Sequence, residues 1–231
     1  MIKAVIFDLD DTLISERKYI ESGYGYISKI LSHRLSLDEQ VLFKQLIKLF
    51  TESPENVFDR LLDQYEFPHT KGFVWDLVEA YRNHFPVIEF NEDVRPCLKL
   101  LKHRKIRTGI ITDGYAHAQR QKLEAIHAYD YFNEIILTDE LGKKYWKPHP
   151  KAFEIMKEKL KVEFDEMIYV GDNPQKDFYI SQIHRIKTIR IYREGVYKTK
   201  NYLEGIKEDH SIHSLLEIDK IIEDYQHDHH L

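Results

Sequence analysis

The most informative segment of the chain is Ile2-Lys3-Ala4-Val5-Ile6-Phe7, together with the turn after it, Asp8-Leu9-Asp10-Asp11-Thr12-Leu13. Five of the first six residues are apolar, and several are β-branched or aromatic. So short an apolar run predicts a strand that is buried on both faces, as in the middle of a parallel sheet. The predicted strand ends in three carboxylates within four positions.

Two of these carboxylates, Asp8 and Asp10, lie on the same side of an extended chain, because side chains alternate along a strand. Carboxylates held together at a buried strand end repel each other, and a cation between them would relieve that repulsion. Mg²⁺ prefers carboxylate and carbonyl oxygen, and ligands of open α/β sheets bind at the carboxyl ends of the strands. The turn therefore predicts a metal site, although the same residues could simply cap a helix.

The composition is that of a globular protein of one large domain, or of a core domain with a small one. The 231 residues are 42% apolar and 32% charged, and the net charge is −5, so no overall basic field attracts nucleic acid. The single cysteine, Cys97, predicts a buried side chain rather than a nucleophile and fits a reducing compartment.

Neither a membrane span nor a leader is expected, because no apolar run approaches about 18 residues and the chain enters a strand at once. We therefore expect a cytoplasmic protein. The histidines near the C-terminus could bind metal, but a frayed polar end is the favoured interpretation.

Residues 14–85 carry a different pattern, in which apolar side chains recur every three or four positions. The pattern predicts about four helices, with starts near Ser36 and Ser53. Tyr19, Gly23, Tyr24 and Tyr26 lie early in the first of them and could stack on a substrate ring, but helix packing is the favoured interpretation.

Strands alternate with helices after residue 86. The predicted strands are Thr108–Thr112, Glu134–Thr138, Met167–Val170 and Lys187–Tyr192. The predicted helices are Glu92–His103, Tyr115–Ile126, Lys151–Leu160, Phe178–His184 and Ile212–Tyr225, with a polar loop over Asp139–Pro150. This alternation predicts an α/β fold with a doubly wound parallel sheet, in which right-handed crossovers bring all strand ends to one edge. Residues 1–13 and 86–231 would form this core, and residues 14–85 an inserted helical domain.

Chemistry-bearing residues gather at that edge. They are Asp8 and Asp10, then Thr112, Asp113 and Gly114 at a helix start, then Lys147, and finally Asp172 and Asp177. The helix start suits a phosphate, because its free N–H groups and dipole favour an anion. Each motif alone is a common turn, but four in this order are hard to obtain by chance.

The order Asp-x-Asp-x-Thr, Thr after an apolar strand, Lys-Pro and Gly-Asp-x-x-x-x-Asp resembles the haloacid dehalogenase superfamily. The helical insert resembles that of its C1-capped branch. The resemblance implies a Rossmann-like core, a mobile cap and a Mg²⁺-dependent phosphatase that acts on a small phosphorylated molecule.

The resemblance also implies roles for individual residues. Asp8 resembles the nucleophile that forms an aspartyl-phosphate, and Asp10 the general acid and base, whose backbone carbonyl binds the metal. Asp172 resembles the metal-binding acid, with Asp177 in support. The metal ligands would then be Asp8, Asp10 and Asp172.

Thr112 and Lys147 resemble the groups that bind the transferring phosphoryl, with Asp113 and Gly114 beside them. The spacing from Gly142 to Lys147 is longer than usual in the family, so Lys143 and Lys144 are less favoured alternatives.

Other functions stay open. A dehalogenase of the same superfamily would need neither a metal nor Asp10, and a phosphomutase or a catalytically idle binding protein could use the same fold. The substrate is undetermined among sugar phosphates, nucleotides and flavin mononucleotide, because the cap would select it.

Overall fold

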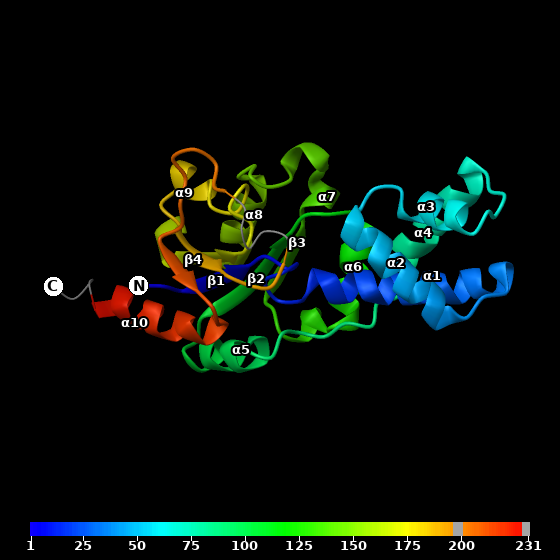
Figure 1. The fold of residues 1–231 in the computed structure, drawn as a ribbon. Helices are drawn as coiled ribbons and strands as arrows, with labels where there is room; N and C mark the ends of the chain where they lie inside the picture. The colour runs from blue at the N-terminus through cyan, green and yellow to red at the C-terminus, as the bar shows by residue number, and fades with distance from the viewer. Residues whose placement is uncertain (196–200, 228–231) are drawn as a thin grey trace. The chain divides into compact units, whose positions relative to one another are not determined.

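The computed structural model describes residues 1–195 and 201–227, so the predicted polar end at His229 and His230 lies outside the described residues. The chain forms two compact units (Figure 1). One comprises Met1–Glu16 and Glu89–Leu231, and the other Arg17–Ile88. Within the described ranges, no helix combines the length and the apolar character that a membrane crossing requires.

The first unit is built on a six-stranded sheet in the order β3-β2-β1-β4-β5-β6, and every pair is parallel. The strands are β1 (Ala4–Phe7), β2 (Arg107–Thr112), β3 (Glu134–Leu137), β4 (Met167–Gly171), β5 (Lys187–Ile191) and β6 (His210–Ile212). All four residues of β1 are buried, which explains its apolar sequence. The predicted doubly wound, Rossmann-like α/β fold is confirmed.

The topological switch point lies between β1 and β4. From β1 the chain adds β2 and β3 on one side and then returns to add β4, β5 and β6 on the other. Phe7 at the end of β1 pairs with Val170 of β4, so the segments that leave these two strands start side by side. Ligands of open α/β sheets bind at such a point.

Helices cover both faces of the sheet. They are α5 (Val94–His103), α6 (Ala116–Ala125), α7 (Thr138–Leu141), α8 (Lys151–Leu160), α9 (Ile180–Ile183) and α10 (Ile218–His227). Figure 1 shows α5 and α10 on one face and α8 and α9 on the other. Phe153 and Met156 of α8 pack with Ile6 and Tyr169 of the sheet in a fully buried cluster. Cys97 is buried on α5, as predicted.

The C-terminal prediction was wrong in one respect. The expected helix Ile212–Tyr225 starts only at Ile218, and a sixth strand, β6, precedes it. This strand is three residues long with one buried side chain, so it has no visible periodicity, and its pairing with β5 defines it. The expected loop Asp139–Pro150 also contains the end of α7 and a short 3₁₀ turn.

The second unit consists mainly of the four expected helices. They are α1 (Glu16–Leu35, which begins in the first unit), α2 (Glu39–Glu52), α3 (Val57–Gln64) and α4 (Lys71–Asn83). The predicted helix starts were wrong in detail. Asp38, not Ser36, caps α2 by accepting hydrogen bonds from the backbone N–H groups of Gln40 and Val41, because it lies directly before the helix.

The tyrosines of α1 mostly pack between helices. Tyr19 and Tyr24 are buried, and each ring lies within about 6 Å of the Tyr81 ring of α4. Gly23 permits this approach, because a Cβ there would lie 2.3 Å from a Tyr81 ring carbon. Tyr26 is exposed. The favoured packing interpretation therefore holds for Tyr19 and Tyr24.

Candidate active site

Asp8 and Asp172 come directly after the two strands that flank the switch point, β1 and β4. Asp8 follows the last residue of β1, and its backbone N–H donates to the Val170 carbonyl oxygen over 2.8 Å. Asp172 follows Gly171, the last residue of β4. Both carboxylates are buried because central strands of a covered sheet end below the protein surface.

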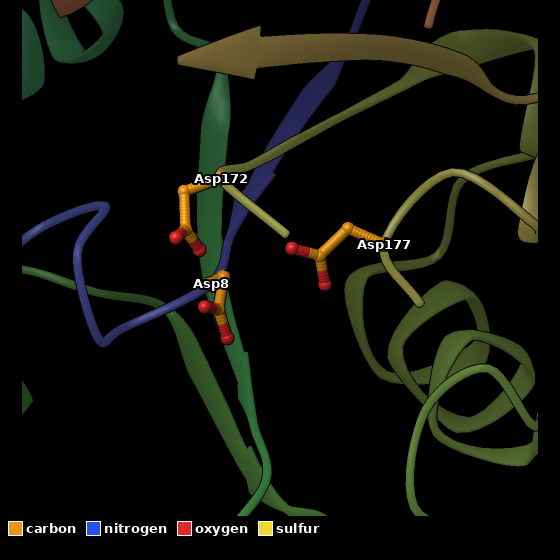
Figure 2. A group of neighbouring side chains, drawn as sticks. All are labelled: Asp8, Asp172 and Asp177. Carbon is orange, nitrogen blue, oxygen red and sulfur yellow. The ribbon is translucent and has the colours of Figure 1, made fainter. Parts of the chain in front are cut away.

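Asp177 joins these two carboxylates. One oxygen from each of Asp8, Asp172 and Asp177 lies within 4.8 Å of the others. Figure 2 shows Asp172 beside Asp8 at the strand ends, with Asp177 reaching toward them from the segment beyond β4. Gly171 makes room for Asp177, because a Cβ on Gly171 would lie 2.4 Å from its carboxylate.

Burial makes these carboxylates unfavourable as anions. Burial raises the pKa of Asp8 to about 6, although Lys147 opposes the shift. Burial, followed by the charges of Asp8 and Asp177, raises the pKa of Asp172 to about 9. The Asp172 carboxylate has no hydrogen-bond or ion-pair partner among the described residues. An additional positive charge is therefore required to keep this group ionised at neutral pH.

Lys147 supplies one positive charge. Its buried Nζ lies 2.6 Å from Asp8 Oδ1, 2.8 Å from Asp177 Oδ1 and 2.8 Å from the Tyr169 hydroxyl. Burial lowers the pKa of Lys147, but Asp177 and Asp8 outweigh that effect and raise it well above its ordinary value. Lys147 is therefore a permanent cation at Asp8.

The alternative lysines lie elsewhere. Lys143 and Lys144 are exposed, and their ammonium groups lie over the rings of Trp146 and Tyr145. The structure thus brings Lys147, not these neighbours, to Asp8.

Asp113 anchors the lysine loop, a role that the sequence did not reveal. Its Oδ1 accepts hydrogen bonds from the Lys147 backbone N–H and the Thr138 hydroxyl, and its Oδ2 accepts one from Lys176 Nζ over 3.0 Å. Burial raises the pKa of Asp113, but Lys147 and Lys176 lower it below its ordinary value overall. Lys176, which no motif singled out, is therefore a second cation at the site.

Two residues of α6 bind the Asp10 side chain. Gln119 Nε2 donates to Asp10 Oδ2 over 2.8 Å and to the Thr112 hydroxyl over 2.5 Å. Lys122 Nζ donates to Asp10 Oδ1 over 2.7 Å. Both are almost fully buried, with Lys122 only 5% exposed. The sequence contained one indication of this role. Gln119 and Lys122 are three positions apart and lie close to the apolar Leu123, so all three share the helix face that is buried.

A cavity of about 160 Å³ collects these groups. Its lining consists of Asp8, Asp10, Asp11, Glu16, Asp113, Gly114, Trp146, Asp172, Asn173 and Lys176. Burial raises the pKa of Asp11 to about 6, and burial together with Asp10 raises that of Glu16 to about 7. The cavity is thus small and acidic, and a bound phosphate would need cations beside it.

The donor set fits a divalent cation. Hard cations bind carboxylate oxygens, and Asp172 offers a buried, unpartnered carboxylate next to Asp8. Asp177 is less available, because Lys147 and Tyr169 donate to its Oδ1 and the Asn173 backbone N–H to its Oδ2. Asp8 and Asp172 are therefore the side chains best placed to hold Mg²⁺. Asp10 turns its carboxylate toward α6, so only its backbone carbonyl stays a candidate ligand.

The parallel sheet and the carboxylate-lined cavity at its switch point define an α/β enzyme. The chain belongs to the haloacid dehalogenase-like hydrolase family, whose sequence model matches residues 5–191. This range includes every predicted site residue from Asp8 to Asp177.

Known proteins similar to this chain include phosphatases. It is 33% identical over 194 residues to glyceraldehyde 3-phosphate phosphatase of Pyrococcus abyssi, across 82% of this chain and 81% of that protein. It is 25% identical over 225 residues to a pyrophosphatase of Oceanobacillus iheyensis, across 96% and 98% of the two chains. The solved structure of a phosphatase of this family from Thermococcus onnurineus matches with a TM-score of 0.61 and 25% identity, across 96% of this chain and 98% of that one.

Proposed function

We propose that this enzyme, a phosphatase of the haloacid dehalogenase-like family, hydrolyses a small phosphate monoester with Mg²⁺ through an aspartyl-phosphate. The observation that carries the proposal is the buried pair Asp8 and Asp172 at the switch point, with Lys147 Nζ 2.6 Å from Asp8. Asp8 and Asp172, with the Asp10 backbone carbonyl, would hold the metal. Bound Mg²⁺ would screen the repulsion between the carboxylates and the phosphate.

Asp8 is the proposed nucleophile. Hydrolysis of a phosphate monoester in water is so slow that the enzyme must lower the barrier by on the order of 20 kcal/mol. A carboxylate that attacks phosphorus divides the reaction into two easier steps. Lys147 fixes the Asp8 carboxylate from one side and adds positive charge where the phosphoryl oxygens develop negative charge. Thr112, with the loop at Asp113 and Gly114, would bind the remaining phosphoryl oxygens.

Asp10 is the proposed general acid and base. In the first step an Asp8 oxygen bonds to phosphorus, and the leaving alkoxide takes a proton from the Asp10 carboxyl. In the second step Asp10 takes a proton from the water that attacks the aspartyl-phosphate, and inorganic phosphate leaves. Gln119 and Lys122 hold the Asp10 carboxylate in a defined position. A dehalogenase would need neither this acid nor Asp172, so these residues favour phosphoryl chemistry.

The proposed substrate class is a short phosphorylated metabolite such as glyceraldehyde 3-phosphate. The small volume of the cavity, about 160 Å³, supports a short molecule. Several of the similar proteins are named glyceraldehyde 3-phosphate phosphatases. Pyrophosphate is the second candidate, because Lys176 places another cation at the cavity that could neutralise a second phosphoryl group.

The helical unit is the proposed cap. We propose residues 14–85 as a C1-type domain with hinges near Leu13 and Pro86, which would exclude water while the intermediate exists. We place the reaction in the cytoplasm, as the lone cysteine suggests.

A substrate screen tests the proposal. Purified protein with Mg²⁺ should hydrolyse p-nitrophenyl phosphate and lose this activity in EDTA. A panel with glyceraldehyde 3-phosphate, pyrophosphate, sugar phosphates, nucleotides and flavin mononucleotide should then rank the substrates by kcat/KM. Full activity in EDTA would refute the metal assignment, and inactivity against every phosphoester would favour a binding protein.

A further inference from the structure

A second and larger cavity, of about 480 Å³, lies in the sheet-containing unit. Residues of α5, the start of β2 and the segment before β3 line it. Its charged lining consists of five cations, Arg95, Lys99, Lys102, Lys105 and Arg107, against the single acid Asp130. Leu98, Ile106 and Phe132 provide buried apolar surface in the same cavity. A basic cavity with an apolar floor is unexpected in a chain of net charge −5.

The five cations are exposed and have no ion-pair partner in residues 1–195 or 201–227. Arg104, in the same stretch of sequence, behaves differently, because it binds Asp219 and Glu223 of α10 over 2.5 Å each. The dipole of α5 accounts for a lysine in its last turn, such as Lys102. It does not account for Arg95 in the first turn. Arg107 on the strand donates a hydrogen bond to the Lys161 carbonyl oxygen over 3.3 Å but has no acidic partner among the described residues.

The uncharged groups of the cavity suit an organic ligand. The Arg95 guanidinium lies 5.7 Å from the centre of the Tyr131 ring, and Tyr131 is 41% exposed. Asn133 Oδ1 accepts a hydrogen bond from the Thr108 backbone N–H over 2.9 Å. This bond orients the Asn133 amide and leaves its NH₂ group to donate to a ligand. Cations, an amide donor, an exposed ring and an apolar floor therefore share one cavity.

This cavity is separate from the catalytic site. Arg107 is the first residue of β2, whereas Thr112, at the catalytic edge, is the last. Five residue steps along a strand span about 16 Å. The cavity thus lies at the amino ends of the strands, and the catalytic cavity lies at their carboxyl ends.

We propose that this cavity binds a nucleoside polyphosphate. The lysines and arginines would bind the phosphates, because charge-assisted hydrogen bonds to phosphate are strong and Arg binds it bidentately. The base would lie against Tyr131 and the apolar floor. The volume falls within the range of about 300–1,000 Å³ that is usual for small-molecule sites. This site does not depend on the proposed function.

The test is calorimetric titration of the full-length protein with ATP, inorganic tripolyphosphate and adenosine. EDTA is present to prevent turnover, and the salt concentration is low so that charges are little screened. ATP should bind at one site, more tightly than tripolyphosphate, and binding should weaken as salt increases. The variant Lys99→Ala/Lys102→Ala should weaken ATP binding by about tenfold or more, because hydrogen bonds to charged groups are the strong ones.

The matched control is Lys44→Ala/Lys48→Ala, in which two exposed lysines of α2 are replaced. It changes the net charge of the protein by the same amount as the test variant. It should leave ATP binding unchanged. No ATP binding, or equal affinity in both double variants and the native protein, would overturn the proposal. Tripolyphosphate affinity equal to that of ATP would overturn the part that assigns a nucleoside. Activity on p-nitrophenyl phosphate with Mg²⁺, measured on the same preparations, tests the proposed function separately.

Discussion

Lys122 Nζ lies 2.7 Å from Asp10 Oδ1, although the two residues are 112 positions apart in the sequence. Gln119 holds the other Asp10 oxygen, so α6 fixes both oxygens of the proposed general acid. Hydrogen bonds from two buried side chains to its two oxygens restrict the carboxylate to one orientation. Helix α6 is therefore a positioning element for Asp10.

The first prediction concerns this contact. Lys122→Met keeps the length of the side chain but removes its charge. Asp10 then loses one of the two side chains that donate hydrogen bonds to its carboxylate. A lost general acid costs about 10²- to 10⁴-fold in kcat, and a misplaced one should cost about tenfold or more. The loss should be larger on an alkyl phosphate than on p-nitrophenyl phosphate, whose leaving group needs little protonation. Lys159→Met is the control, and equal kcat values in the two variants would contradict the role.

The second prediction separates nucleophile from acid. Asp8→Asn should form no phosphoenzyme and retain almost no activity. Asp10→Asn keeps the backbone carbonyl and should still bind substrate, but it should lose about 10²- to 10⁴-fold in rate. The penalty at Asp10 should shrink on p-nitrophenyl phosphate. Burst kinetics show whether dephosphorylation limits the rate, and a fully active Asp10→Asn variant would refute the assignment.

The third prediction concerns Asp172, which is 7% exposed and has no partner among the described side chains. Without a metal, Asp172 must take up a proton on folding at neutral pH, because burial and the charges of Asp8 and Asp177 raise its pKa to about 9. Asparagine avoids this cost, so Asp172→Asn should stabilise the metal-free protein, by about 1–3 kcal/mol. Mg²⁺ should raise the melting temperature of the native protein but not that of the variant. Thermal unfolding in EDTA and in Mg²⁺ measures both effects. A Mg²⁺ shift that survives in the variant would remove Asp172 from the metal site.

The fourth prediction is a dependence of stability on pH, away from the site. Asp93 accepts hydrogen bonds from Arg193 Nη2 and the Leu215 backbone N–H, both over 2.8 Å, and so links α5 to the chain before α10. Burial raises the pKa of Asp93, but the Arg193 and Leu215 hydrogen bonds lower it below its ordinary value. A lowered folded-state pKa stabilises the fold above the unfolded pKa of about 3.9, and this stability is lost as pH falls through the folded pKa.

Asp93→Asn should therefore destabilise the protein by about 1–3 kcal/mol at pH 7. The difference in melting temperature from the native protein should shrink as the pH is lowered below about 4. Thermal unfolding between pH 7 and pH 3 tests this, with the exposed Asp76→Asn as control. A difference that stays constant over this range would contradict the linkage.

The fifth prediction addresses the proposed cap. Hydrogen exchange near Leu13 and Pro86 should slow when Mg²⁺ and a phosphate mimic bind together, because closure would order the hinges. Exchange that is identical in the free and bound protein throughout residues 14–85 would refute a mobile cap here.

Elements with strong local patterns could be predicted from the residues alone. The apolar run of β1 and the acidic turn at Asp8 could be located because burial on both faces leaves a continuous apolar signal. Helix α8 was predicted with its observed bounds, Lys151–Leu160, because its apolar periodicity is local and Pro148 and Pro150 come directly before it. The convergence of Asp8, Asp172 and Lys147 also followed from topology, since parallel strands share a carboxyl edge.

The pairing of polar side chains, by contrast, became visible only in the folded chain. Asp113 was expected beside the phosphate but holds Lys147 and Lys176, and Lys122 reaches Asp10 across 112 positions. Strand β6 likewise exists through its pairing with β5. Such contacts have no local signature, because a buried lysine or a three-residue strand is stable only when the fold brings its partner to it. The chain's local pattern thus specifies where strands end, and the packing of distant segments specifies the charge environment there.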